Sequence, residues 1–311
     1  MKIKRQLCPA KRDTAVALGF FDGVHRGHQA VLQQAVFCKT DALVPAAFTF
    51  LKSPQAQLRK KEAPALLTMQ QKEALFAESG IELLYTVDFR QVMLLSPYDF
   101  VEEVLVRTLR AKKVFCGFNY HFGSGGKADA HILSEICREF SIEVVSVPPV
   151  LYKDAPVSST RIRKALMQGD IDDATQMLGR PFAFDFAVQK GNQLGRRLHT
   201  PTFNQPFPAG FVLPRFGVYA TAVCLEDGLR CGVTNIGMRP TVGAVSPLAE
   251  TWMPQDTCGE LYGKKIEVQL LAFLRDEKKF ESLEQLQSAI LKDGCRAQRV
   301  FAQYMEKKPG K

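Results

Sequence analysis

In the first half of the chain, short apolar runs alternate with segments whose apolar residues recur at helical spacing. Buried strands are predicted by the apolar runs 15–18, 43–50, 83–87, 114–116 and 142–147. Amphipathic helices are predicted over 29–37, 68–79, 96–109 and 132–140. Strands that alternate with helices imply a parallel sheet covered by helices on both faces. This half is therefore predicted to be an α/β domain.

The pattern changes near residue 170. A polar helix is predicted over 171–178, and Gly179-Arg180-Pro181 follows it as a predicted hinge. Beyond it, strands with period-two stretches are predicted over 182–190, 217–225, 229–235 and 266–274. A capping box at Ser282-Leu283-Glu284-Gln285 opens a last helix towards Met305. These signals predict a small β-barrel with a C-terminal helix, and two domains, 1–181 and 182–311.

Composition narrows the class of protein without identifying it. Hydrophobic residues make up 46% and charged residues 23%, and no apolar run approaches the roughly 20 residues that span a bilayer. The 8 cysteines include no Cys-x-x-Cys pair, and the basic N-terminus lacks an apolar signal region. We therefore expect a cytoplasmic protein without a membrane partner. The net charge of +9 fits anionic ligands, although a merely basic surface would give the same number.

The segment 19–28, GFFDGVHRGH, carries the strongest chemical signal. It joins a predicted strand to a predicted helix, and the first turn of a helix offers unpaired N–H groups to an anion. His25 and His28 are three residues apart, so both rings can face the same ligand. A metal pair or two surface histidines are the alternatives. The strand before the turn and the helix after it favour a phosphate site.

His25-Arg26-Gly27-His28 resembles the His-x-Gly-His signature of the nucleotidylyltransferase superfamily. The longer motif resembles the start of the bacterial bifunctional riboflavin kinase/FMN adenylyltransferases, also called FAD synthetases. The resemblance implies a Rossmann-like nucleotidylyltransferase domain in which the two histidines steady the phosphates of ATP while pyrophosphate leaves. It places Gly19, Phe20, Asp22 and Gly23 in the same phosphate site.

Two further segments resemble parts of this domain. The stretch 157–163, VSSTRIR, combines hydroxyls at a predicted helix start with two arginines that suit phosphate oxygens. An N-cap with surface arginines is the alternative. The resemblance implies that the triphosphate is held by Ser158, Ser159, Thr160, Arg161 and Arg163. In 116–123, CGFNYHFG, it implies that Asn119 helps to place substrate phosphate, where composition alone indicates a turn.

The stretch 191–204 resembles the glycine-rich riboflavin kinase signature. The resemblance implies that Gly191, Gly195 and Arg196 contact the nucleotide and that Thr202 and Asn204 bind Mg²⁺. The segment departs from the family at three positions: His199-Thr200 replaces Gly-Phe, and Phe203 replaces Ala. A glycine loop between two strands is the alternative interpretation.

Three later segments also resemble the kinase family. Glu250 lies where the family carries its catalytic glutamate. The segment 232–241, GVTNIGMRPT, and the segment 274–280, LRDEKKF, resemble two further family motifs. They imply that Asn235, Arg239 and Arg275 are candidate flavin contacts.

The resemblance implies one chain with two reactions: riboflavin is phosphorylated to FMN, and FMN is adenylylated to FAD. ATP is the co-substrate, Mg²⁺ the metal, and riboflavin, FMN and FAD the substrate, intermediate and product. We expect small-molecule partners, no nucleic acid, and a monomer or transient oligomer. Two alternatives stay open: an FMN adenylyltransferase whose kinase module is weak or inactive, and a non-catalytic nucleotide- or RNA-binding regulator of the same fold.

Overall fold

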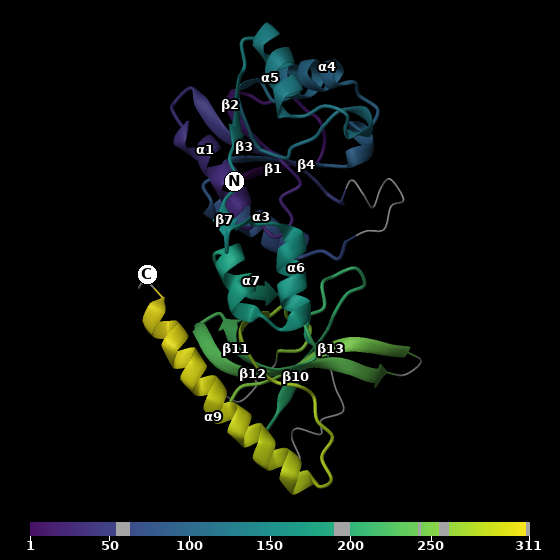
Figure 1. Ribbon diagram of the computed structural model, residues 1–311, viewed down its shortest axis with the longest axis vertical. Helices are drawn as coiled ribbons and strands as arrows, with labels where there is room; N and C mark the ends of the chain where they lie inside the picture. Colours follow the sequence, from purple (N-terminus) through teal and green to yellow (C-terminus); the bar gives the residue numbers. More distant parts are fainter. Residues whose placement is uncertain (54–62, 190–199, 242–243, 255–260, 309–311) are drawn as a thin grey trace. The chain divides into compact units, whose positions relative to one another are not determined.

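A computed structural model describes residues 1–53, 63–189, 200–241, 244–254 and 261–308 (Figure 1). The chain divides into two compact units. Unit 1 comprises Met1–Pro64 and Met69–Ser159, and unit 2 comprises Ala65–Thr68 and Thr160–Lys311.

Unit 1 contains a parallel sheet of order β1-β4-β3-β2-β5-β6. Its strands are β1 (Lys2–Lys4), β2 (Asp13–Leu18), β3 (Leu43–Phe50), β4 (Leu83–Val87), β5 (Ala111–Gly117) and β6 (Glu143–Val147). Its helices are α1 (Arg26–Phe37), α3 (Met69–Glu78), α4 (Pro97–Asp99) continuing into η2 (Phe100–Thr108), and α5 (Ala130–Glu139). Short helical turns η1 (Phe89–Gln91) and η3 (Ser124–Gly126) and the hairpin β7 (Leu151–Tyr152) and β8 (Ala155–Pro156) complete it.

Helices cover both faces of this sheet, as predicted. Val16 and Leu18 of β2 pack in one cluster with residues of η2 and α5. The alternate residues Ala15 and Ala17 point to the opposite face, where α1 buries Leu32 against the sheet. Strand β2 lies between β3 and β5, so strand order reverses beside it. Ligands of such sheets bind at the carboxyl ends of the strands at this switch point.

Unit 2 contains an antiparallel sheet of order β10-β13-β12-β11-β14-β9. Its strands are β9 (Phe182–Phe184), β10 (Thr202–Pro206), β11 (Gly217–Leu225), β12 (Gly228–Thr241), β13 (Ala244–Trp252) and β14 (Glu267–Arg275). Beyond β9, the N–H of Gln189 donates to the carbonyl of Asn204 in β10 (2.8 Å), so an isolated bridge links the segment after one edge strand to the other edge strand.

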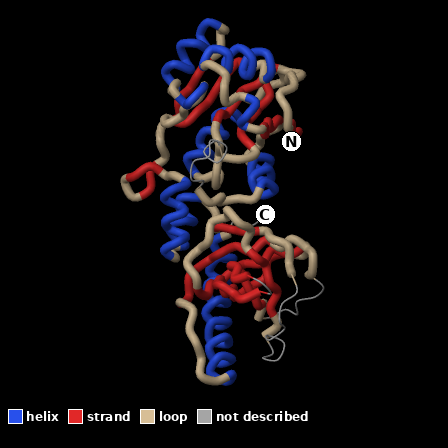
Figure 2. Tube along the Cα trace, turned by 90° about the vertical axis from the view of Figure 1, so that its right-hand side faces the viewer, coloured by secondary structure: helices blue, strands red, loops and turns tan. Residues whose placement is uncertain are grey.

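The described residues of this unit also include the helices α6 (Ser159–Gln168), α7 (Ile171–Leu178) and the long α9 (Leu283–Lys307), which runs along the strands in Figure 2. Ala297 of α9 packs against Val218, Val233 and Trp252 of the sheet. The predicted cap is confirmed, because the side chain of Ser282 accepts the N–H of Gln285 (3.2 Å).

Some predicted elements differ in extent. The strand predicted over 182–190 is regular only at Phe182–Phe184, and the one predicted over 229–235 extends from Gly228 to Thr241. Strands β10 and β13 were not predicted. Helices α6 and α7, placed by the sequence before the boundary at 181, are grouped with unit 2. The N–H of Arg215 donates to the carbonyl of Leu166 there, which ties α6 to the segment before β11.

Candidate active sites

The histidine turn follows β2 at the switch point of unit 1. Strand β2 ends at Leu18, and α1 begins at Arg26 with His25 as its N-cap. Asn119 is exposed just beyond the end of the neighbouring strand β5. The structure thus brings the ends of these two predicted motifs to one edge of the sheet.

The backbone of the turn is held in an unusual conformation. Phe21 and Val24 have positive φ angles of 53° and 39°, and Gly23 has a φ of 82°. A positive φ at a bulky residue costs about 1–3 kcal/mol and is found mostly at functional sites. Asp22, between them, is buried, and its carbonyl accepts the Ser159 hydroxyl (2.8 Å). This bond joins the histidine turn to the second predicted phosphate motif.

The two histidines form a stacked pair. Their ring centroids are 3.6 Å apart at an interplanar angle of 16°. Nδ1 of His25 accepts the N–H of His28 (3.3 Å), so a neutral His25 carries its proton on Nε2 and can donate it to a ligand. A Cβ on Gly27 would lie 3.3 Å from the His25 ring, which explains the small residue there.

His28 is the neutral member of the site. Burial, the neighbouring His25 and the charge of Lys72 hold the pKa of His28 well below its usual range. Its Nδ1 is buried and has no hydrogen-bond partner within the part of the chain that the structure describes. Because buried polar atoms are nearly always paired, this atom points to a missing ligand.

The remaining residues of the second phosphate motif lie on α6. Ser158 immediately precedes this helix, and Ser159 begins it. Thr160 is exposed in its first turn, and the half-buried Arg161 and Arg163 follow. The sequence pattern thus places hydroxyls and guanidinium groups at the start of a single helix.

In unit 2, the predicted kinase residues fall in one row across the barrel sheet. Asn204 of β10 pairs with Glu250 of β13, and Glu250 pairs on its other side with Asn235 of β12. The row continues through Val218 to Arg275 on β14. Directly paired residues point to the same face. Four residues spread over 72 positions of sequence therefore share one face.

Asn204 and Thr202 supply oxygen atoms at one end of this row. Asn204 is 6% exposed, and its Oδ1 has no hydrogen-bond partner among the described residues. Thr202 is exposed two residues earlier and therefore points to the same face. An amide oxygen and a hydroxyl are hard donors of the kind that suits Mg²⁺, so these residues fit the predicted metal.

Phe203 points away from this face. It is 3% exposed and pairs with Thr251, whose hydroxyl shares a buried chain of hydrogen bonds with Thr234 and Thr221. The substitution of Phe for Ala therefore fills the far side of the sheet rather than the face of Thr202 and Asn204.

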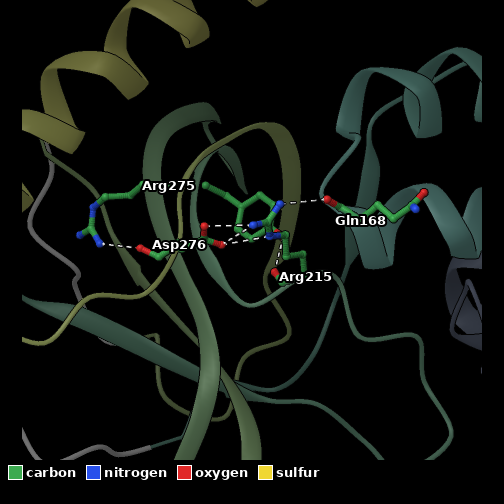
Figure 3. Close-up of polar contacts among 5 residues, drawn as sticks. Gln168, Arg215, Arg275 and Asp276 are labelled. Atoms are coloured by element: carbon green, nitrogen blue, oxygen red, sulfur yellow. Dashed lines mark hydrogen bonds and ion pairs between the residues drawn. The ribbon is translucent and has the colours of Figure 1, made fainter.

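Three predicted flavin contacts lie on this sheet. The Nε of Arg275 donates to Oδ2 of the buried Asp293 on α9 (2.9 Å). Its Nη1 donates to the carbonyl of Asp276 (3.0 Å; Figure 3). Asn235 donates to Glu277 (3.3 Å). Arg239 lies on β12 opposite Ser246. The Arg275 guanidinium thus has structural partners, and the flavin role of all three residues stays a prediction.

Beside Arg275, a second arginine holds the same loop. Arg215 forms two hydrogen bonds with the Asp276 carboxylate, both 3.0 Å, and reaches the carbonyl of Gln168 at 3.4 Å (Figure 3). The end of β14 is therefore anchored both to α9 and to the end of α6.

The predicted glycine-rich kinase segment lies in part outside the described residues, which do not include Gly191, Gly195, Arg196 and His199.

Lys72 was missed by the sequence analysis. It lies on α3, is buried, and contacts the carbonyl of Phe20 in the histidine turn. The available signal was its position four residues before Phe76, because a lysine on the apolar stripe of a helix is unusual.

No group of three or more His, Cys, Asp or Glu residues that could hold a metal occurs in the described ranges. No helix there is both long and apolar enough to cross a bilayer.

Comparisons with known proteins agree with this geometry. The family model for FAD synthetase matches residues 8–161, and that for riboflavin kinase matches 178–301. The bifunctional riboflavin kinase/FMN adenylyltransferase of Escherichia coli K12 is 34% identical over 92% of both chains. The Pseudomonas fluorescens enzyme of the same name is 33% identical over 95% of this chain and 96% of its own.

A solved structure has the same fold over most of its length. It is titled as a macrolide-efflux protein from Streptococcus pneumoniae and matches with a TM-score of 0.85 and 29% identity, over 94% of this chain and 97% of the other. With two family models and full-length relatives in agreement, the chain belongs to the bifunctional riboflavin kinase/FMN adenylyltransferases.

Proposed function

We propose that the two reactions of this family are divided between the two candidate sites. The histidine turn with the 158–163 segment adenylylates FMN, and the Asn204–Glu250–Asn235 row phosphorylates riboflavin. One observation supports this division: residues distant in sequence become direct neighbours, Asp22 with Ser159 and Asn204 with Glu250.

The kinase reaction needs a base, because a neutral ribityl hydroxyl is a weak nucleophile. Glu250 orients this hydroxyl and accepts its proton as the γ-phosphoryl group of ATP is transferred, giving FMN and ADP. Thr202 and Asn204 would hold Mg²⁺, which offsets the negative charge of the phosphates. Asn235, beside Glu250 in the row, helps to fix its position.

Adenylyl transfer needs donors rather than a base, because the attacking FMN phosphate is already an anion. It attacks the α-phosphorus of ATP, and pyrophosphate leaves. His25 and the neutral His28 donate N–H groups to the phosphates, and Arg161 and Arg163 offset the charge of the leaving pyrophosphate. Burial and the neighbouring charges lower the pKa of His28, which keeps that ring neutral and suits this role.

A time course with riboflavin, ATP and MgCl₂ tests the assignment. FMN is expected to appear first and FAD later. Conversion of added FMN to FAD without use of riboflavin would instead support the alternative with an inactive kinase module. Absence of both reactions would support a non-catalytic regulator. We further propose a cytoplasmic location, because every cysteine in the described part of the chain is a free thiol. We also propose that the protein has no nucleic-acid partner and acts as a monomer or transient oligomer.

A further inference from the structure

A buried lysine supports the histidine turn from outside the known motifs. Lys72 is 6% exposed, and its Nζ donates to the carbonyl of Phe20 (2.5 Å) and to the hydroxyl of Thr49 (2.9 Å). The Thr49 hydroxyl donates in turn to the same Phe20 carbonyl (2.9 Å). The ammonium also lies 4.5 Å from the centroid of the Phe20 ring. Lys72 therefore fixes the histidine turn to helix α3 at Phe20.

The same helix reaches the histidines through aromatic contacts. Phe76, one turn after Lys72, meets the ring of Phe21 edge to face at 5.4 Å. Phe21 in turn meets the ring of His28 at 5.3 Å. Two side chains on one stripe of α3 thus fix two consecutive residues of the turn, and the second of these touches a proposed phosphate ligand.

The printed contacts of the Lys72 ammonium are with neutral groups, the Phe20 carbonyl and the Thr49 hydroxyl. The charged or titratable groups that interact with it are Asp22 of the turn, Glu73 on its own helix, and His28 of α1. Burial outweighs the two carboxylates and lowers the pKa of Lys72 to about 7. A buried charge of this kind is costly unless an anion accompanies it.

We propose that Lys72 is a positioning residue for adenylyl transfer: its ammonium fixes the Phe20–Asp22 backbone, and the polyphosphate of the bound nucleoside triphosphate balances its charge. ATP therefore binds better to the form of the protein in which Lys72 is protonated. This proposal rests on the assignment of the histidine turn as the nucleotide site.

The proposal predicts a specific pH dependence. A bound polyphosphate favours the ammonium and raises the pKa of Lys72 in the complex above its value of about 7 in the free protein. The kcat/KM for ATP in FMN adenylylation should therefore fall as pH rises above about 7, by up to about ten-fold per pH unit. His28 does not contribute to this fall, because its pKa lies well below the same range.

The test uses the full-length protein with FMN and ATP as substrates, from pH 6 to 9. Lys72→Met removes the charge and keeps the aliphatic chain, whereas Lys72→Arg keeps a charge that does not titrate. Lys11→Met, at an exposed lysine of the same unit, is the matched control. Thermal unfolding and riboflavin phosphorylation report whether each variant is folded. Comparing wild type with Lys72→Arg cancels the titration of ATP itself.

Lys72→Met is expected to lower kcat/KM for ATP at least ten-fold at pH 7, mainly through KM. Lys72→Arg is expected to stay within a few-fold at pH 7 and to lose the decline at higher pH. Identical pH profiles for wild type and Lys72→Arg would overturn the proposal, even if Lys72→Met does not fold. Wild-type kinetics in Lys72→Met would also overturn it.

A histidine variant separates this proposal from the one on which it rests. If His28→Phe loses FAD formation while Lys72→Met retains it, only the role of Lys72 is wrong. If both variants retain wild-type FAD formation, the histidine turn is not the nucleotide site.

Discussion

Asn204 and Glu250 face each other on the neighbouring antiparallel strands β10 and β13. Cβ atoms of such pairs are about 4.5–5.5 Å apart, so the unpaired amide oxygen of Asn204 lies close to the proposed base. A slip of one residue in this register would turn Glu250 to the opposite face, among the buried threonines. The pairing of two strands thus brings the proposed metal ligand Asn204 and the proposed base Glu250 together.

Glu250→Gln replaces the proposed proton-accepting carboxylate by an amide of nearly the same size. We expect riboflavin phosphorylation to fall about 10²–10⁴-fold, with FMN adenylylation unchanged. Separate assays with riboflavin and with FMN measure the two reactions. Glu226→Gln, at an exposed glutamate of the same unit, serves as the control. Equal loss of both reactions would contradict the division between the sites.

The metal role of Asn204 predicts a change in Mg²⁺ requirement. Asn204→Leu removes the oxygen donor and should raise the Mg²⁺ concentration for half-maximal riboflavin phosphorylation at least ten-fold. Asn204→Asp keeps an oxygen and should retain more activity. Titration with MgCl₂ at saturating ATP and riboflavin measures both. An unchanged Mg²⁺ requirement in Asn204→Leu would exclude Asn204 as a ligand.

At the other site, His28 should act through its N–H group. His28→Phe keeps a ring of similar size without a donor and should slow FAD formation about 10²–10³-fold. His28→Gln restores a neutral donor and should recover part of the rate. Steady-state formation of FAD from FMN and ATP distinguishes them. Equal rates in both variants would show that the ring contributes only packing.

Burial of Lys72 should make the stability of the protein depend on pH. The folded pKa of about 7 lies below the ordinary value of 10.5, so the unfolded chain binds more protons between these pH values. Destabilisation by the buried charge is full below pH 7 and diminishes as pH rises, by up to about 1.4 kcal/mol per pH unit. Denaturant unfolding at pH 6.5, 7.5 and 8.5 should show this slope in wild type relative to Lys72→Met. Parallel curves would contradict it.

The contact between Arg275 and Asp293 predicts a structural role for the arginine. Asp293 is 3% exposed, whereas the Arg275 side chain is partly exposed to solvent. Removing the arginine therefore takes away the ion-pair partner of a nearly buried carboxylate. Arg275→Met should lower the free energy of unfolding by about 1–3 kcal/mol. Arg275→Met combined with Asp293→Leu should recover much of the loss. If the double variant is stable but its KM for riboflavin is raised, Arg275 also contacts the flavin.

Most of the elements could be predicted from local sequence pattern. Strands β3, β4 and β11 and helix α7 have the predicted bounds, because hydrophobic periodicity reflects the geometry of a single helix or strand. The cap at Ser282 was predicted for the same reason, since a capping bond spans three residues. Strand β10 was missed because its residues 202–206 were interpreted as part of a glycine-rich phosphate loop.

Sequence pattern predicted the order of most elements and the types of residue at each candidate site, from the histidine turn to Glu250. Which of these residues meet depends on the tertiary structure. Strand register placed Asn204, Glu250 and Asn235 in one row and turned Phe203 to the other face. Packing of α3 brought Lys72 to the Phe20 carbonyl, 52 residues away in sequence. Such contacts depend on how distant segments pair and pack, and local pattern carries little information about that.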